Sequence, residues 1–243
     1  MRGLGTIINV AAIIAGGLIG IFFKRYIKEH YQETIIKVTG ISVIFLGAAG
    51  SLAKMLAVNP ATGALETQKS LMMILSLVLG ALIGEIINIE GAFERLGEWL
   101  KMKSGSSGDT RFLDAFLTAS FTVCIGAMAI IGAIEDGLYG DHSILVAKAI
   151  LDLVIIVIMA AAMGKGCIFS AVPVGILQGS VTLLSGFLAP VMTAGAAANL
   201  SLVGNILIFC VGLNLIRPKT VRVANLLPAI VIAAAFAFVP GMG

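Results

Sequence analysis

The chain has 243 residues, of which 59% are hydrophobic and only 12% are charged, and its mean hydropathy is +1.07. Because a soluble domain carries roughly 25% charged residues, this composition excludes an ordinary soluble protein and predicts one whose main partner is the lipid bilayer. The net charge of +3 is too small to indicate a nucleic acid partner, since the basic residues lie beside apolar runs and form no single patch.

Apolar segments of about the length that crosses a bilayer as a helix, roughly 20 residues, follow one another along the chain. They are 4–23, 34–57, 70–89, 112–134, 143–163, 167–190, 199–216 and 223–240. The first is interpreted as a retained span, because no A-x-A cleavage site follows it. We therefore expect an all-α integral membrane protein, a polytopic helical bundle of about eight transmembrane spans in a single domain over residues 1–243. A count of seven stays open.

The sixth segment, 167–190, is the reason for that alternative, because glycine and proline interrupt it and polar residues such as Gln178 lie within it. It is either a polar-faced span or a broken or re-entrant helix, which is tolerated only where it faces protein or a watery cavity. With eight spans and the N-terminus outside, the inner loops hold most of the 16 basic residues, as the positive-inside rule requires. Glu135, Asp136 and Asp141 then fall in an outer loop. This distribution favours a true span.

Between the third and fourth spans, residues 91–103 have the pattern of an amphipathic helix. Phe93, Leu96 and Leu100 share one face, whereas the charged residues fall largely on the other. The pattern predicts a short interfacial helix in the inner headgroup region, or a cytosolic helix packed on the bundle.

Glycines at four-residue spacing predict close contacts between helices, because a missing side chain lets two backbones approach. The positions are Gly16 with Gly20, Gly80 with Gly84, and Gly175 with Gly179, to which we add Gly126. We expect packing within one subunit, and a homodimer seam at no more than one of these pairs.

Two opposite charges, Lys148 and Asp152, lie one helical turn apart in the fifth segment, which is otherwise apolar. A charge in hydrocarbon costs roughly 2.5–3.5 kcal/mol on insertion scales, so the pair indicates a polar position inside the bundle. Asp152 is predicted to bind a cation or proton or to fix the polar end of a substrate, although a static ion pair is the alternative. For Lys148 the static role is preferred, since it lies nearer the outer end and can extend towards the interface.

Uncharged polar residues in other spans are further candidates for a binding site. Asn9, Gln178 and Asn214 can line a solute site, or can only bridge helices for about 0.6 kcal/mol each. Gln178 lies close to Pro173 and Gly179, which favours a lined cavity. Glu85 is a possible second protonatable group, but a position at the inner interface is the preferred interpretation.

Motifs for enzymatic chemistry are absent from the sequence. It contains no HExxH, G-x-S-x-G or Walker motif, and its two histidines lie in predicted loops. The three cysteines lie in apolar segments, which indicates buried thiols and neither disulfides nor zinc. We therefore expect no enzyme, no cofactor and no metal.

The leading hypothesis is a secondary transporter of a small solute or ion, H⁺- or Na⁺-coupled through Asp152. An ion channel formed in a dimer and a non-transporting scaffold are the alternatives.

The run FTVCIGAMAIIGAIEDGLYGD at 121–141, followed by Lys148, Asp152 and Gln178-Gly179, resembles the YdfK/YqgA family of prokaryotic inner-membrane proteins, defined by a domain of unknown function. The resemblance covers nearly the whole chain, and Cys124-x-Gly126-x-Met128 is its most specific part. It implies a compact polytopic fold in the prokaryotic cytoplasmic membrane, and it implies no substrate. The polar positions that it supports are Asn9, Cys124, Lys148, Asp152, Gln178 and Asn214.

Overall fold

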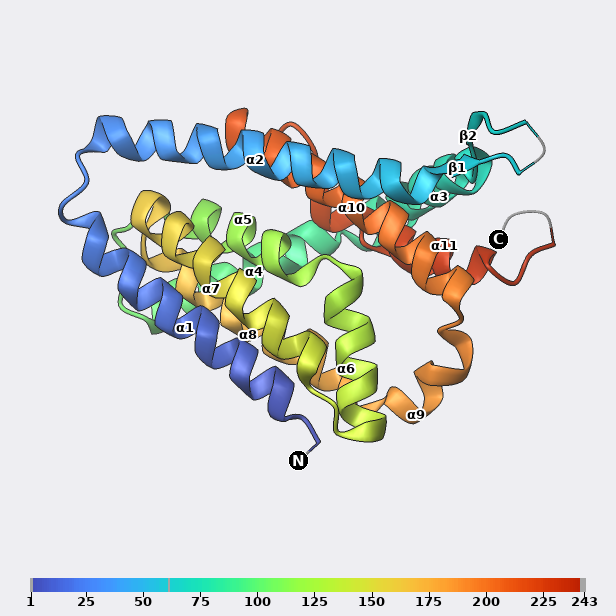
Figure 1. The fold of residues 1–243 in the computed structure, drawn as a ribbon. Helices are drawn as coiled ribbons and strands as arrows, with labels where there is room; N and C mark the ends of the chain where they lie inside the picture. The colour runs from blue at the N-terminus through green and yellow to red at the C-terminus, as the bar shows by residue number, and fades with distance from the viewer. Residues whose placement is uncertain (1, 61, 241–243) are drawn as a thin grey trace.

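Helices make up most of the protein, as Figure 1 shows for a computed structural model that describes residues 2–60 and 62–240. The helices are α1 (Leu4–Lys24), α2 (Glu29–Met55), α3 (Ser70–Ile87), α4 (Ile89–Lys103), α5 (Phe112–Cys124), α6 (Ala127–Tyr139), α7 (Ser143–Met163), α8 (Ala171–Leu183), α9 (Ser185–Leu188), α10 (Ala194–Ile216) and α11 (Pro228–Phe236). Three short 3₁₀ helices, η1 (Lys165–Ser170), η2 (Ala189–Val191) and η3 (Val223–Leu226), join some of them. This architecture confirms the predicted helical membrane bundle.

The predicted apolar segments all coincide with helices, but two of them are not single long helices. Within the described residues, 6 helices are long and apolar enough to cross a membrane, and η1 with α8 is one of them. The fourth segment is instead a pair, α5 and α6, bent by 61°, and the eighth is the shorter helix Val223–Phe236. Counting the bent pair as one span gives up to 7.

Two features at the helix ends differ from the expectation. The second helix stops at Met55, and the chain continues into a small antiparallel hairpin of β1 (Leu56–Val58) and β2 (Leu65–Thr67), which the hydropathy pattern did not predict. Asp136 lies inside α6 and is fully buried, so it does not belong to an outer loop. Its helix continues to Tyr139, so Glu135 and Asp136 are helical and only Asp141 lies in the loop.

Glycines set the register between neighbouring helices. Along α1, successive glycines meet successively later residues of α7, so these two helices run parallel; the pairs are Gly5–Leu145, Gly16–Leu153 and Gly20–Val157. Along α2 the order is reversed against α10, so these two run antiparallel; the pairs are Gly40–Leu215 and Gly50–Asn205. These are the directions that an eight-span topology gives to the first and fifth spans and to the second and seventh.

The sixth segment traverses the bundle from end to end. Ile168 of η1 lies against Gly17 in the second half of α1. Thr182 of α8 lines the same pocket as Thr6, which is near the start of α1. The segment therefore runs antiparallel to α1 and does not turn back halfway. Helix α1 lies beside both α7 and α8 (Figure 1), and the three helices contribute to one apolar core together with α5.

The glycines singled out in the sequence have different surroundings. A Cβ atom at Gly16, Gly20, Gly80 or Gly84 would collide with the backbone of α7, η3 or α11, and at Gly175 it would lie 3.4 Å from Val10. At Gly126 and Gly179 it would meet nothing within 4 Å. The first four allow helices to pack closely, whereas the last two adjoin open space.

A matched pair of substitutions separates these two kinds of glycine. Gly20→Ala places a methyl group against the carbonyl of Val157, and overpacking of this kind typically destabilises by about 1–3 kcal/mol. Gly179→Ala meets no neighbour and gains helix propensity, so its melting temperature should stay level or rise. We expect Gly20→Ala to melt several degrees lower in detergent. Equal melting temperatures for the two variants would contradict the packing register.

Candidate functional site

The bent fourth segment contains a break in its backbone hydrogen bonding. Helix α5 ends at Cys124, Ile125 is extended, and α6 begins only at Ala127. Between them Gly126 has φ 150°, a conformation that glycine adopts more easily than other residues. In a continuous helix the N–H of Ala127 would bond to the carbonyl of Val123. The break leaves that carbonyl to find another donor inside the bundle.

Lys148 supplies that donor. Its Nζ donates to the carbonyl oxygen of Val123 at 2.7 Å and to Oδ2 of Asp152 at 2.5 Å. Lys148 and Asp152 are only 6% and 4% exposed, so the lysine does not extend to the membrane surface as the sequence allowed. A cation at a helix C-terminus is also favoured by the helix dipole. The ammonium therefore joins the broken end of α5 to α7.

Two buried amides, bonded to each other, extend from this ion pair. Asn9 of α1 is fully buried, lies beside the carboxylate of Asp152, and donates from Nδ2 to Oε1 of Gln178 on α8 at 3.3 Å. Residues from the first, fifth and sixth segments thus meet at the break in the fourth. We call Asn9, Lys148, Asp152 and Gln178 the central cluster.

The central cluster keeps unused hydrogen-bonding capacity. Among the described residues, Oδ1 of Asn9 and Nε2 of Gln178 are buried without a partner. An unsatisfied buried polar group costs about 1–3 kcal/mol, so such groups are normally found with water or a ligand. The cluster can therefore accept and donate further hydrogen bonds without breaking the ion pair.

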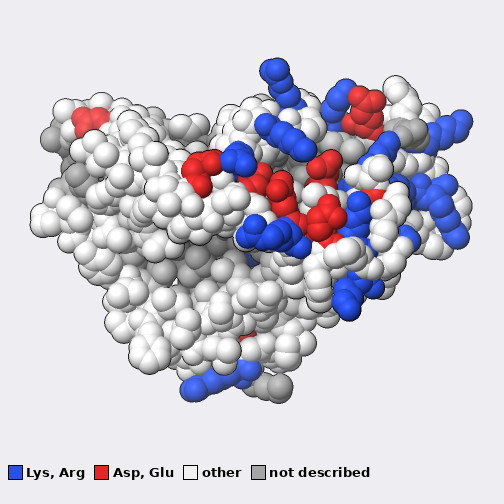
Figure 2. Space-filling view, turned by 180° about the vertical axis from the view of Figure 1, so that it is seen from behind, with Lys and Arg blue, Asp and Glu red and all other residues white. Residues whose placement is uncertain are grey.

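A cavity of about 800 Å³, which we call the charged pocket, opens at the end of the bundle where α7 stops. Carboxylates (Glu33, Glu90, Glu94, Asp114) and cations (Arg111, Lys219, Arg222) line it together. Figure 2 shows charged side chains gathered over one part of the surface beside a wide uncharged area. Thr118 and Phe121 also line the pocket, so it reaches along α5 to the turn before Cys124.

A second cavity of about 540 Å³, the small pocket, lies at the opposite end of the bundle, where α1 starts. Its lining is mostly small and uncharged and includes Thr6, Gly179 and Thr182. Asn9 is three residues beyond Thr6, and Gln178 is next to Gly179. The central cluster therefore lies between two pockets that open at opposite ends.

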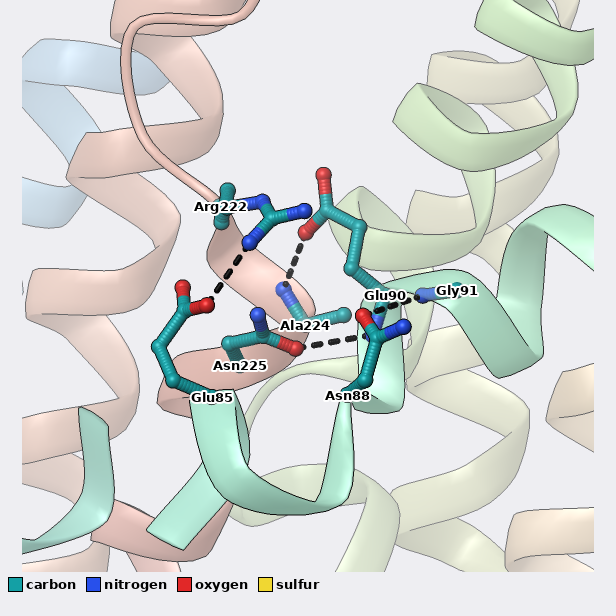
Figure 3. Close-up of polar contacts among 7 residues, drawn as sticks. All are labelled: Glu85, Asn88, Glu90, Gly91, Arg222, Ala224 and Asn225. Atoms are coloured by element: carbon teal, nitrogen blue, oxygen red, sulfur yellow. Dashed lines mark hydrogen bonds and ion pairs between the residues drawn. The ribbon is translucent and has the colours of Figure 1, made fainter. Parts of the chain in front are cut away.

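Glu85 lies apart from the central cluster, near the charged pocket, and its carboxylate faces Arg222 (Figure 3). Its Oε2 pairs with Arg222 at 2.7 Å, and both side chains are about half exposed, at 48% and 61%. Next to it, Glu90 accepts from the N–H of Ala224 at 3.2 Å and donates its own N–H to Oδ1 of Asn225 at 2.8 Å. These bonds fasten the corner between α3 and α4 to η3.

Asn214 also lies away from the central cluster. Its Nδ2 donates to the carbonyl of Val221, and its Oδ1 accepts the N–H groups of Thr220 and Val221 at 3.0 Å each. It lines the charged pocket, where it holds the loop after α10.

Asp136 is a buried polar residue that sequence reasoning assigned to a loop. Its Oδ2 accepts the N–H of Gly5 at 3.0 Å in the first turn of α1, and its Oδ1 has no partner among the described residues. Apolar residues at helical spacing continue past Asp136 to Leu138, and this pattern could have placed Asp136 within the helix Ala127–Tyr139. No group of three or more His, Cys, Asp or Glu that could hold a metal occurs among the described residues.

The buried ion pair Lys148–Asp152 should contribute more to the stability of the protein than an exposed ion pair of the same spacing. Lys148→Met strands the carboxylate of Asp152 and the Val123 carbonyl, and losing one partner of a buried pair typically costs about 3–5 kcal/mol. Lys37→Met removes a lysine from a pair of the same spacing, Lys37–Glu33, whose side chains are 55% and 66% exposed. We expect a drop in melting temperature of about 10 °C for the first and little change for the second. Adding Asp152→Asn should recover most of the loss. Equal behaviour of the two single variants would contradict the assignment.

The pKa of Glu90 gives a second prediction. Burial raises the pKa of this carboxyl, although the hydrogen bond from Ala224 and the charge of Arg222 act in the opposite direction. Above the ordinary glutamate pKa, the unfolded chain has lost a proton that the folded protein still holds, so stability falls as pH rises through the folded-state pKa. Glu90→Gln keeps the acceptor for Ala224 and removes this dependence. It should melt higher than the unchanged protein at neutral pH and equally at acid pH.

The control for this experiment is Glu94→Gln, which removes an exposed carboxylate from the same helix. A parallel pH profile for Glu90→Gln and the unchanged protein would show that Glu90 is not the responsible group.

Comparisons with known proteins agree with the resemblance seen in the sequence. YdfK of Bacillus subtilis (strain 168), described as an uncharacterized membrane protein, is 31% identical over 236 residues, which cover 97% of this chain and 96% of YdfK. YqgA of Escherichia coli (strain K12), described as an uncharacterized protein, is 27% identical over 234 residues, covering 95% and 94%. No solved structure matches the chain. The family model described as "Protein of unknown function (DUF554)" matches residues 4–238, which is nearly the whole chain. This membrane protein therefore belongs to the DUF554 family.

Proposed function

We propose that this protein is a secondary transporter of a small solute and has no enzymatic activity. In this proposal it lies in the prokaryotic cytoplasmic membrane with its N-terminus outside, which puts the charged pocket on the cytoplasmic side and the small pocket on the outer side. The central cluster is then the site that binds the solute or its coupling ion, and Asp152 is the group that takes up a cation or proton.

One observation carries the proposal: Lys148 bridges the broken end of α5 and the buried carboxylate of Asp152, beside amide atoms that have no partner. Ionisable groups inside membrane bundles generally mark ion or substrate pathways. In secondary transporters, discontinuous helices supply the binding site near the bilayer midplane, where backbone freed by the break meets the ligand. The cluster combines both features.

The two pockets support the same proposal. A carrier exposes one site alternately to the two sides of the membrane, so it needs an approach from each side. The charged pocket approaches the break along α5 through Phe121, and the small pocket approaches it along α1 and α8 through Thr6 and Thr182. The bent pair α5–α6 runs between them, and a change in its 61° bend would alter both approaches.

Solute binding can be tested without knowing the solute in advance. The purified protein is heated in detergent with a panel of amino acids, organic acids, inorganic cations and anions. A ligand at about 100 times its Kd stabilises the native state by roughly 2.7 kcal/mol, which corresponds to a rise of about 5–10 °C in melting temperature.

The solute that raises the melting temperature should lose its effect in Asp152→Asn and Gln178→Ala. Asp152→Asn removes the counter-ion of Lys148 and should itself melt lower, so the effect of the solute is measured against the ligand-free melting temperature of each variant. Glu85→Gln, in the exposed ion pair with Arg222, is the control and should keep the full solute-induced rise in melting temperature.

Single-channel currents in planar bilayers would favour a channel. Silence in both assays, with a stable co-purifying partner, would favour a scaffold.

A further inference from the structure

Polar side chains continue from the small pocket to the central cluster in two layers. Thr6 and Thr182 line the pocket, and their Oγ1 atoms are buried without a partner among the described residues. One helical turn further in, on the same two helices, lie Asn9 and Gln178. Because α1 and α8 are antiparallel, both helices descend through the layers together. We call Thr6, Thr182, Asn9 and Gln178 the polar file.

Space for water accompanies the polar file. Gly179 lies between its layers on α8 and lines the small pocket, and a Cβ atom there would meet nothing within 4 Å. The unpartnered atoms of the file are the two hydroxyls, Oδ1 of Asn9 and Nε2 of Gln178. A buried water typically makes about three hydrogen bonds to polar groups that would otherwise remain unsatisfied. The file offers such groups at each successive turn.

We propose that the polar file is a water-filled path by which protons from the outer side reach Asp152, and that the proton is the coupling ion. The inference rests on the proposed function for its role in transport, whereas the path and its proton chemistry can be tested separately.

The donors and acceptors of the file fit water better than a metal cation. The amides of Asn9 and Gln178 share one hydrogen bond, which leaves the amide oxygen of Asn9 and the NH2 group of Gln178 unpartnered among the described residues. Turning both amides over leaves the same pair of groups, one acceptor and one donor. Na⁺ requires a shell of oxygens, and an N–H group pointing into that shell would repel it. A chain of waters uses donors and acceptors equally well.

The charged and titratable groups around Asp152 are few. Lys148 on its own helix and Cys124 on α5 face it, whereas α1 and α8 present the uncharged Asn9 and Gln178. On α6, Asp136 lies towards the outer end against Gly5, and Lys24 of α1 lies at the far end of α7 against Gly164. Of these two carboxylates, Asp136 lies near the small pocket at the outer end, whereas Asp152 lies at the inner end of the polar file.

The path is tested by labelling single cysteines with a small cationic thiosulfonate that does not cross membranes. Cys124, Cys167 and Cys210 are first replaced by Ala. Gly179→Cys and Gln178→Cys should react when the reagent is added outside, because only a thiol in contact with water forms the reactive thiolate. Ile176→Cys on the same helix, at a side chain 63% exposed to the membrane region, is the control and should react at least tenfold more slowly.

Reaction of Gln178→Cys no faster than Ile176→Cys, or only from the cytoplasmic side, would overturn the path. Asn9→Cys replaces Gln178→Cys if that variant does not fold, and the same outcomes apply to it.

The identity of the ion is tested with a hydrophobic carbodiimide, which reacts with protonated carboxyl groups in apolar surroundings. Modification of Asp152, located by mass spectrometry and absent in Asp152→Asn, should quicken as pH falls, by up to about tenfold per pH unit. Replacing choline chloride by sodium chloride should leave the rate unchanged. Protection by Na⁺, or no modification of Asp152 at any pH, would overturn the proton assignment. Neither result depends on finding a transported solute, so failure of the ligand screen and failure of this inference are distinguishable.

Discussion

The rest of the site depends on the carbonyl oxygen of Val123. Inside a bilayer an unsatisfied backbone group costs several kcal/mol, and the break after α5 creates one. Lys148 satisfies it, but the ammonium then needs a counter-ion, which Asp152 provides from the next turn of α7. The carboxylate in turn lies beside Asn9, which bonds to Gln178. Each polar group in the series compensates the one before it, and the series ends in amide atoms that have no hydrogen-bond partner among the described residues.

Close packing of α1 against α7 brings the last members of this series together. Gly16 and Gly20 let the two backbones approach in parallel, and this register places Asn9 level with the turn that carries Asp152. Bulkier residues at these two positions would push the helices apart and separate the amide from the carboxylate. The glycines therefore contribute to the site although they carry no functional group.

The sequence predicts the members of the cluster better than their arrangement. Lys148, Asp152, Asn9 and Gln178 stand out because polar side chains are rare in apolar segments, and the i, i+4 spacing of the charges already implies contact. The break at Gly126 could not be predicted in the same way, because hydropathy measures how apolar residues are and not the direction of the chain. Spacing alone also cannot separate Gly20, which packs on α7, from Gly179, which adjoins open space.

The break and the ion pair depend on each other, and that dependence bears on function. With a continuous helix, Val123 would bond to Ala127 and Lys148 would have no carbonyl to satisfy. A chain that only had to cross the membrane could therefore omit both the break and the charges, since apolar residues in place of a buried pair are often as stable or more stable. The structure instead keeps a buried ion pair beside hydrogen-bonding atoms that have no partner among the described residues, between two pockets. Such an arrangement is useful where a ligand or proton must bind and leave again, as the proposed transport requires.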